Sequence, residues 1–218
     1  MPERAAATTD ADPRGASAPE SAASTSTFTL DDVAFVPYAG EDVHMPVVMD
    51  LIGRELSEPY SVFTYRYFIN NWPKLCVLAY ANDVPIGVVV CKLEKHRDMY
   101  RGYVGMLVVA RTHRKLKLGS ALVSRALAVM QSEGADECVL EVESTNVGAL
   151  RLYQNLGFIR DKRLERYYLS GNDAYRMKLL FPLSPERAAE LEAQSAKLAE
   201  EEEEAAAERK RAAKKQGT

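Results

Sequence analysis

Residues 103–120 read YVGMLVVARTHRKLKLGS, an apolar run followed by a basic segment that contains glycine. The uncharged run Tyr103–Ala110 is typical of a strand covered on both faces. The segment Arg114–Ser120 then opens a helix predicted over Gly119–Gln131. Unpaired backbone N–H groups and the helix dipole favour an anion at such a helix start, and glycine lets a ligand approach the backbone. The stretch predicts a diphosphate site, although a solvated basic loop or a nuclear-localisation signal would carry the same charges.

A second strand–helix pair follows. The strand Glu137–Glu143 alternates, with Cys138, Leu140 and Val142 on one face and Val139, Glu141 and Glu143 on the other. The helix Asn146–Leu156 has an apolar stripe that includes Tyr153, and Gly157 ends it. Taken alone, Tyr153 on this stripe is equally consistent with a core aromatic residue.

The rest of the pattern completes a mixed α/β domain. Asn82-Asp83 favours a tight turn between two apolar runs, which predicts a hairpin. The other predicted elements are a strand at Val33–Tyr38, helices at Asp42–Leu56 and Val62–Trp72, hairpin strands at Leu75–Ala81 and Pro85–Glu94, and final strands at Phe158–Leu169 and Asp173–Phe181.

The spacing Asn146-x-x-Ala149-x-x-x-Tyr153-x-x-x-Gly157-Phe158, downstream of the basic loop, resembles the GNAT superfamily. The acetyl-CoA loop of that family has the form Arg/Gln-x-x-Gly-x-Gly/Ala. The resemblance implies a mixed central sheet of about seven strands flanked by about four helices, with a charged C-terminal helical tail added here. It implies acetyl-CoA as co-substrate, with Leu107, Val108 and Val109 along the pantetheine, Arg114, Lys115, Lys117, Gly119 and Ser120 at the phosphates, and Asn146 and Tyr153 near the thioester.

Lys117 departs from this family pattern, because it stands where the loop has its first glycine. A lysine at that point either faces away from the diphosphate or supplies an ammonium to a phosphate. We favour the second arrangement, since the helix start already concentrates positive potential there.

Further segments resemble the catalytic subunits of N-terminal acetyltransferase C (NatC). This resemblance implies nascent chains that begin with Met followed by a bulky hydrophobic residue, two auxiliary subunits, and work at the ribosome. It implies an acceptor groove between Glu58, Pro59 and Tyr60 on one side and Tyr167 and Tyr168 on the other; a surface aromatic patch without a ligand is the alternative. The segments are Ser57–Ser61, Tyr65–Phe68, Asn71–Pro73, Arg101–Tyr103, Asp161–Leu164 and Arg166–Leu169.

Acetyl transfer to a peptide α-amine needs only a modest base, because the amine has a pKa of about 7.7–8. Glu143 at the end of its strand is the candidate base, Glu141 on the same face is its competitor, and a solvated strand-end carboxylate is the alternative for Glu143. Tyr153 would donate to the departing sulfur. Two other functions stay open: acetylation of lysine or small amines, and an acetyl-CoA-binding scaffold without catalysis.

Charge, cysteine and histidine content indicate which partners and cofactors to expect. The net charge of −3 over 218 residues suggests neither nucleic acid nor membrane as a direct partner. Cys76, Cys91 and Cys138 lie in apolar runs and are expected as buried thiols, and the three histidines lack metal-ligand spacing, so we expect no metal. With no signal segment or apolar run long enough for a bilayer, we expect a cytoplasmic protein.

Composition also divides the chain into three parts. Residues 1–27 are rich in Ala, Ser, Thr and Pro and are expected to be disordered, and residues 28–183 form the expected GNAT domain. Residues 184–218 form a charged tail that is either a solvated helix or disordered. A partner-docking helix or a nuclear-localisation patch is the alternative for this tail.

Overall fold

A computed structural model describes residues 6–7, 28–56, 60–183, 185–190, 192–193 and 195–197. The chain divides into two compact units, Met1–Phe181 and Pro182–Thr218. In the second unit the described residues from 185 onward are helical. The first tail, expected over residues 1–27, lies outside the described residues except for Ala6 and Ala7.

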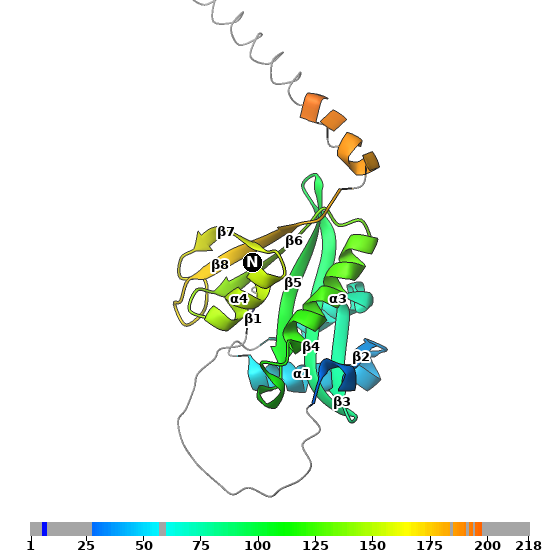
Figure 1. Ribbon diagram of the computed structural model, residues 1–218, viewed down its shortest axis with the longest axis vertical. Helices are drawn as coiled ribbons and strands as arrows, with labels where there is room; N and C mark the ends of the chain where they lie inside the picture. Colours follow the sequence, from blue (N-terminus) through cyan, green and yellow to red (C-terminus); the bar gives the residue numbers. More distant parts are fainter. Residues whose placement is uncertain are drawn as a thin grey trace, which may run out of the picture. The chain divides into compact units, whose positions relative to one another are not determined.

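The first unit is built on one mixed sheet with the strand order β2-β3-β4-β5-β6-β8-β7, to which the two-residue β1 adds on β5 (Figure 1). Pairing is antiparallel except between β5 and β6 and between β1 and β5. The strands are β1 Ala6–Ala7, β2 Ala34–Pro37, β3 Cys76–Ala81, β4 Val84–His96, β5 Met99–Val109, β6 Glu137–Glu143, β7 Ile159–Leu164 and β8 Ala174–Leu180.

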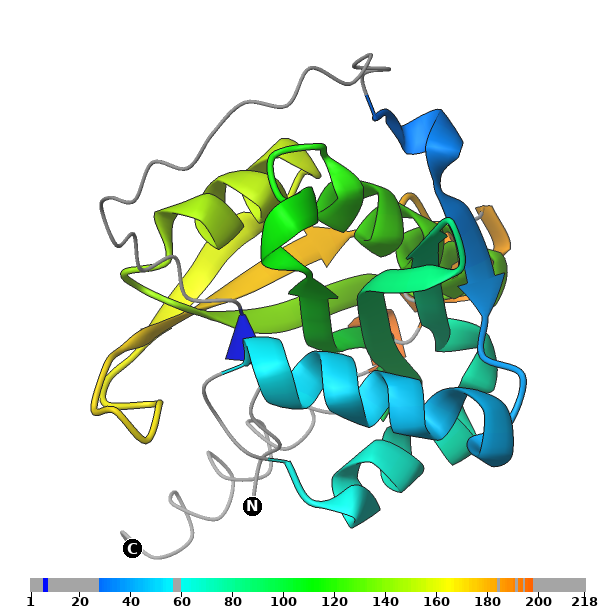
Figure 2. The ribbon, with the colours of Figure 1, turned by 90° about the horizontal axis from the view of Figure 1, so that it is seen from below.

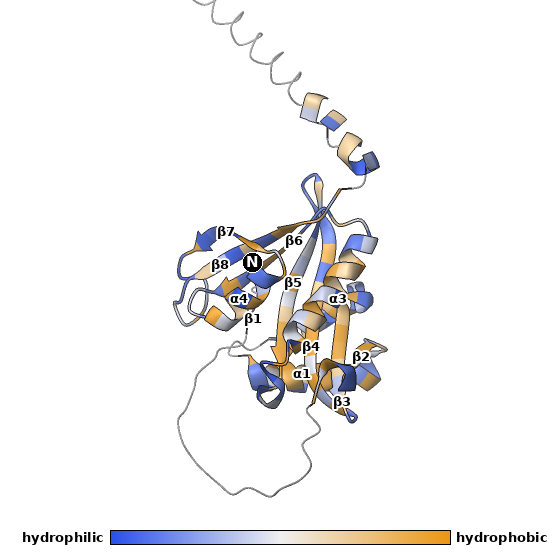
Figure 3. Cartoon of the chain, viewed as in Figure 1, coloured by the Kyte–Doolittle hydropathy of each residue, from blue (hydrophilic) through white to orange (hydrophobic). Residues whose placement is uncertain are grey.

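Helices cover both faces of this sheet (Figure 2). α1 (Glu41–Glu55) and α2 (Val62–Asn71) bury their apolar residues in one cluster with β4 and β5. α3 (Leu118–Ser132) and α4 (Val147–Asn155) pack into a second cluster on the opposite face. The apolar strands therefore lie between two layers of helices, and the helices in Figure 3 carry both hydrophobic and hydrophilic residues. Short 3-10 helices stand at Leu30–Asp32, Pro73–Leu75 and Arg111–His113.

The predicted alternation of β6 is confirmed. Cys138, Leu140 and Val142 belong to the α3–α4 cluster, whereas Val139 belongs to the α1–α2 cluster. The carboxylates of Glu141 and Glu143 are therefore on the α1–α2 side of the sheet. The three cysteines are free and buried, also as predicted.

Two strand boundaries differ from the prediction. The β4–β5 hairpin extends to the pair His96–Met99, because cross-strand pairing carries polar residues into the ladder that apolar periodicity cannot detect. The strand expected to reach Leu169 ends at Leu164, since Arg166 and Gly171 have φ of 48° and 83° and turn the chain.

Parallel strands β5 and β6 separate part-way along their length. They pair only where Arg101–Tyr103 faces Glu137–Val139, although both strands continue for several residues. Beyond that point β1 pairs with Met106 and Leu107 of β5. Beyond their three pairs the two strands are not bonded to each other in the middle of the sheet, and we call this separation the splay.

Candidate active site

A pocket of about 340 Å³ opens where β5 runs into α3 and where α4 begins. Its lining mixes apolar side chains from the strand with polar and basic ones from the loop. Eight residues predicted from the sequence to bind acetyl-CoA line it: Leu107, Val109, Arg114, Lys115, Lys117, Gly119, Asn146 and Tyr153.

Lys117 is the N-cap of α3 and has a left-handed backbone, with φ of 59°. Lys115 is also left-handed, with φ of 67°. This conformation is easiest for glycine, so the lysine at position 117 reproduces the backbone shape of the loop at some conformational cost. The first N–H groups of α3 are thereby left without helical partners at the edge of the pocket.

Gly119 lies where α3 packs closely against α4. A Cβ added there would lie 2.8 Å from Cδ1 of Leu152 on α4 and 3.6 Å from Cγ2 of Val109. Contacts shorter than normal van der Waals distance force backbone or side-chain shifts. The glycine thus lets α3 and α4 approach each other closely beside the pocket.

Arg114 connects the basic loop to the end of α1. Its Nε donates to the carbonyl oxygen of Val109 at 3.2 Å, and its Nη2 donates to Oε2 of Glu55 at 2.9 Å. Arg111 Nε lies 3.6 Å from the same oxygen of Glu55. Two arginines of the loop therefore converge on one carboxylate that immediately precedes the predicted acceptor loop.

Tyr153 comes from α4 and is only 3% exposed. Its ring packs edge-on against Phe158 at a centroid distance of 5.7 Å. Burial raises the pKa of the Tyr153 phenol, with smaller contributions from Cys91 and Cys138. The phenol is therefore protonated at neutral pH and able to donate a hydrogen bond into the pocket that it lines.

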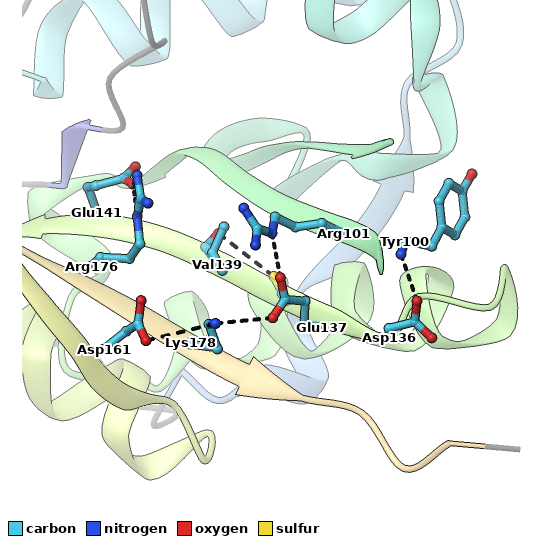
Figure 4. Close-up of polar contacts among 10 residues, drawn as sticks. Tyr100, Arg101, Asp136, Glu137, Val139, Glu141, Asp161, Arg176 and Lys178 are labelled. Carbon is cyan, nitrogen blue, oxygen red and sulfur yellow. Dashed lines mark hydrogen bonds and ion pairs between the residues drawn. The ribbon is translucent and has the colours of Figure 1, made fainter. Parts of the chain in front are cut away.

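Glu141 stands on β6 just beyond the last β5–β6 pair and is 3% exposed. Its Oε1 accepts from Nε of Arg176 on β8 at 2.8 Å, and its Oε2 accepts from the hydroxyl of Tyr103 on β5 at 2.8 Å. Figure 4 shows the Arg176 contact. Burial, and then the charge of Glu141, raise the pKa of Tyr103 well above its usual range, so the phenol stays a donor.

Glu143 has a different environment two residues further along β6. Its Oε1 accepts from the side-chain amide of Asn172, in the turn between β7 and β8. Glu143 is 9% exposed, so both carboxylates are buried. They differ in their partners: Glu141 is held by an arginine and a phenol, and Glu143 by a neutral amide.

Tyrosines from distant segments surround Glu141. Tyr168 donates to the backbone oxygen of Glu141 at 3.4 Å, and its ring lies 5.3 Å from that of Tyr167. Burial, followed by the proximity of Tyr167, Glu141, Tyr153 and Tyr60, raises the pKa of Tyr168. Glu58 and Pro59, the other predicted acceptor residues, lie outside the described residues.

The closed end of the splay is fastened by Glu137 (Figure 4). Its carboxylate pairs with Nε of Arg101 on β5 at 2.5 Å and with Nζ of Lys178 on β8 at 3.3 Å. Lys178 also lies 3.8 Å from Asp161 on β7. These ion pairs span four strands and fix the point from which β5 and β6 separate.

A protein-family model described as the acetyltransferase (GNAT) family matches residues 45–158, which contain the splay, the basic loop and α4. The chain belongs to the GNAT acetyltransferases. Its fold, predicted from the sequence, is confirmed, and as a GNAT acetyltransferase it uses acetyl-CoA.

Relatives place this GNAT protein among the NatC-type N-alpha-acetyltransferases. It is 51% identical over 155 residues to N-alpha-acetyltransferase MAK3 of Arabidopsis thaliana, covering 71% of this chain and 81% of the relative. It is 52% identical over 148 residues to human N-alpha-acetyltransferase 30, covering 67% of this chain but 41% of the longer relative. The predicted family and enzyme class are thereby confirmed.

The fold is also similar to that of a solved NatC structure. The crystal structure of the NatC complex bound to Gag peptide and CoA contains a chain that is 41% identical, with a TM-score of 0.67, covering 69% of this chain and 99% of that one.

Two predicted cofactor residues of this GNAT domain do not line the pocket. Val108 points into the α1–α2 cluster because alternate residues of a strand face opposite sides, and Ser120 is the third residue of α3. Most lining residues that sequence reasoning missed come from α4, namely Gly148, Ala149, Arg151, Leu152 and Asn155. The others are His113, at the end of a 3-10 helix, and Leu118, the first residue of α3.

Tyr103 and Arg176 were also missed as site residues. Tyr103 lies in a segment that carries the NatC resemblance, but nothing in the sequence pairs it with Glu141, 38 residues away. Arg176 stands opposite Glu141 in the β6–β8 register, which only the fold reveals. Among the described residues there is no metal-binding group of three or more His, Cys, Asp or Glu, and no helix that is long and apolar enough to cross a membrane.

Proposed function

We propose that this NatC-type N-alpha-acetyltransferase acts on nascent chains that begin with Met followed by a bulky hydrophobic residue. We propose that it does so in the cytoplasm, as a catalytic subunit with two auxiliary subunits that bring it to the ribosome. The high identity to NatC-type enzymes supports this substrate class, as does the similar fold of a NatC chain solved with a peptide and CoA.

Acetyl-CoA would occupy the 340 Å³ pocket on the α3–α4 face. The N–H groups at the start of α3 and the basic side chains of Lys115 and Lys117 would bind its phosphates. The pantetheine arm would extend along Leu107–Val109 of β5, where the splay separates β5 from β6, and would displace the two-residue β1 from Leu107. An amide of this segment would polarise the thioester carbonyl.

The acceptor would enter from the α1–α2 face. The observation that carries this proposal is the meeting of both faces at the splay, where Tyr168 is close to Tyr153 on the cofactor side and to Glu141 and Tyr60 on the other. Tyrosine hydroxyls suit the backbone of a peptide terminus, and their rings suit an apolar first side chain. Glu58 and Pro59 would complete this groove.

In the reaction, the neutral α-amine attacks the thioester carbonyl carbon, a C–N bond forms and the C–S bond breaks. A carboxylate on β6 takes the amine proton, directly or through a water, and Tyr153 donates a hydrogen bond to the departing sulfur. Glu143 was the base predicted from the sequence. The contacts in the structure favour its competitor Glu141, because Tyr103 and Arg176 hold it where the tyrosines converge.

The test is CoA release with peptides that begin Met-Leu, Met-Lys and Ser-Glu, and with a Met-Leu peptide whose N-terminus is blocked but which retains an internal lysine. We expect the free Met-Leu peptide to be turned over fastest and the blocked peptide not at all. Equal turnover of the blocked peptide would establish lysine acetylation instead. Binding of acetyl-CoA without turnover of any peptide would establish a scaffold.

A further inference from the structure

Lys92 on β4 is a cation that lies beside three aromatic rings and pairs with a carboxylate. Its side chain is 14% exposed, and Nζ lies 5.4 Å from the ring centroid of Tyr67, 5.8 Å from that of Phe68 and 5.6 Å from that of Tyr103. Glu94 pairs with the same ammonium at 2.7 Å. Rings attract a cation through their electron-rich faces, and this attraction grows when water is excluded.

A lysine is a costly choice for this position. Removing a charge from water is unfavourable unless it is well paired, and an apolar side chain would fill the space under α2 without that cost. Glu94 and the three rings offset that cost, so these contacts, and not packing alone, explain the residue.

Two of the three rings, Tyr67 and Phe68, come from α2, and the third is Tyr103. Lys92 and Tyr103 are direct cross-strand partners in the β4–β5 ladder, so their side chains stand on the same face of the sheet. Tyr103 is also the phenol that donates to Glu141 at 2.8 Å. A continuous line of contacts thus runs from Glu94 through Lys92 and Tyr103 to the carboxylate at the splay.

We propose that Lys92 is a positioning residue for acetyl transfer: its ammonium fixes the Tyr103 ring, and Tyr103 in turn directs the Glu141 carboxylate toward the acceptor amine. This role rests on the proposed function, because it assigns Glu141 to the acceptor side of the reaction. In this role Lys92 acts through Tyr103.

The first test is Lys92→Met, which keeps a long apolar stem and removes the charge. We expect kcat with the Met-Leu peptide to fall about tenfold, because the carboxylate is less well oriented. Acetyl-CoA affinity should stay within about twofold, since its pocket is on the opposite face. Lys92→Arg should recover at least about a third of kcat, because a guanidinium also stacks on aromatic rings. Unchanged kcat in Lys92→Met would overturn the proposal.

A double-mutant cycle separates positioning from general loosening of the fold. Tyr103→Phe removes the donor to Glu141, and the variant carrying both changes should be no slower than Tyr103→Phe alone. Losses that multiply would mean that Lys92 acts by another route. Lys74→Met is the matched control, because this lysine also pairs with a glutamate, Glu133 at 3.0 Å, but its side chain is 78% exposed; its kcat should be unchanged.

A spectroscopic signal reports the ring cluster independently of turnover. The single tryptophan of the chain, Trp72, packs edge-on against Tyr67 at 5.5 Å. Its fluorescence should shift in Lys92→Met and be restored in Lys92→Arg; a spectrum unchanged in Lys92→Met would contradict the ring contacts. If the wild-type enzyme does not turn over Met-Leu peptides, the proposed specificity fails, and the same kcat comparison is made with the acceptor that the peptide panel identifies.

Discussion

At position 117 the GNAT loop pattern has glycine and this chain has lysine, in a left-handed backbone with φ of 59°. A residue with a Cβ loses about 1–2 kcal/mol in that conformation relative to its usual one. The lysine side chain is exposed at the mouth of the pocket, where it adds positive charge near the start of α3. The left-handed backbone of Lys117 therefore lowers the stability of the fold, whereas its positive charge favours an anion at the pocket.

Lys117→Gly should raise the melting temperature by a few degrees, because it removes the left-handed strain. Because this change also removes the ammonium, acetyl-CoA binding should weaken by no more than about 1 kcal/mol, the free energy of one exposed ion pair. Lys117→Ala keeps the strain and loses the charge, so it should bind acetyl-CoA a few-fold more weakly, more so at low salt. Titration calorimetry at two ionic strengths measures the affinity of each variant for acetyl-CoA, and scanning calorimetry measures the melting temperature. Complete loss of acetyl-CoA binding in Lys117→Gly would contradict the assignment of this loop to the phosphates.

Tyr153→Phe should lower turnover roughly ten- to a thousandfold while acetyl-CoA still binds, since proton-donating groups contribute about 10²–10⁴ to rate. The phenol is buried and protonated, so only the hydrogen bond to sulfur is lost and the ring still fills its place. Steady-state CoA release gives kcat, and direct titration gives the affinity. Near-normal kcat would remove Tyr153 from the chemistry.

At the scale of elements, β6 presents two buried carboxylates to the same face, and its neighbours distinguish them. Tyr103 on β5 and Arg176 on β8 hold Glu141, whereas the turn after β7 holds Glu143 through Asn172. The turn itself depends on Asp173, which accepts from the backbone N–H of Arg166 at 2.9 Å and from Nε of Arg163 at 2.7 Å. The turn before β8 thus connects β6 to the hairpin that we propose to contact the acceptor.

Glu141→Gln should lower kcat by about a hundredfold or more and shift the pH optimum upward, because the amine must then lose its proton without a base. Glu143→Gln should lower kcat by less than about tenfold, since it alters only the contact with the hairpin. A pH–rate profile for each variant measures this. The reverse order of effects would restore Glu143 as the base.

Asp173→Asn should raise the peptide KM about two- to fivefold and leave the acetyl-CoA KM unchanged, because it loosens the hairpin that carries Tyr167 and Tyr168. The Arg166 N–H, and then Arg163, lower the pKa of Asp173 below its usual value. The stabilisation it provides is therefore complete above pH of about 4 and lost as pH falls further. Acid unfolding followed by circular dichroism should show the stabilities of the variant and the wild type converging as pH falls through the lowered pKa of Asp173. The control Asp50→Asn, in an exposed helix pair, should leave the peptide KM unchanged.

At the scale of the whole molecule, the N-terminal segment reaches the site. Ala6 and Ala7 pair in parallel with Met106 and Leu107 of β5, and Leu107 lines the pocket. The segment therefore lies on the backbone groups that we assign to pantetheine. The core of the unit begins later in the chain, with Val33 as its first buried residue among those described.

Removal of residues 1–27 should leave the melting temperature within about two degrees and lower the acetyl-CoA KM two- to fivefold, because a two-residue pairing is weak and is displaced by the cofactor. Kinetics of the full and shortened chains measure this. An unchanged or higher KM would mean that β1 does not compete with acetyl-CoA.

The sequence alone determined the order of helices and strands, the basic loop before α3, the alternation of β6 and membership of the GNAT acetyltransferases. These depend on interactions between near neighbours, such as the Asn146 side chain that accepts from the N–H of Ala149 at 3.0 Å. Only the tertiary structure decided which groups share the site. Tyr103 meets Glu141, Arg114 meets Glu55, and Lys92 meets three rings because strand register and helix packing bring together residues up to 59 positions apart. The periodicity of a strand predicts which face of the sheet a side chain is on. Which residue of a neighbouring strand it contacts depends on the strand register and on the point where β5 and β6 separate.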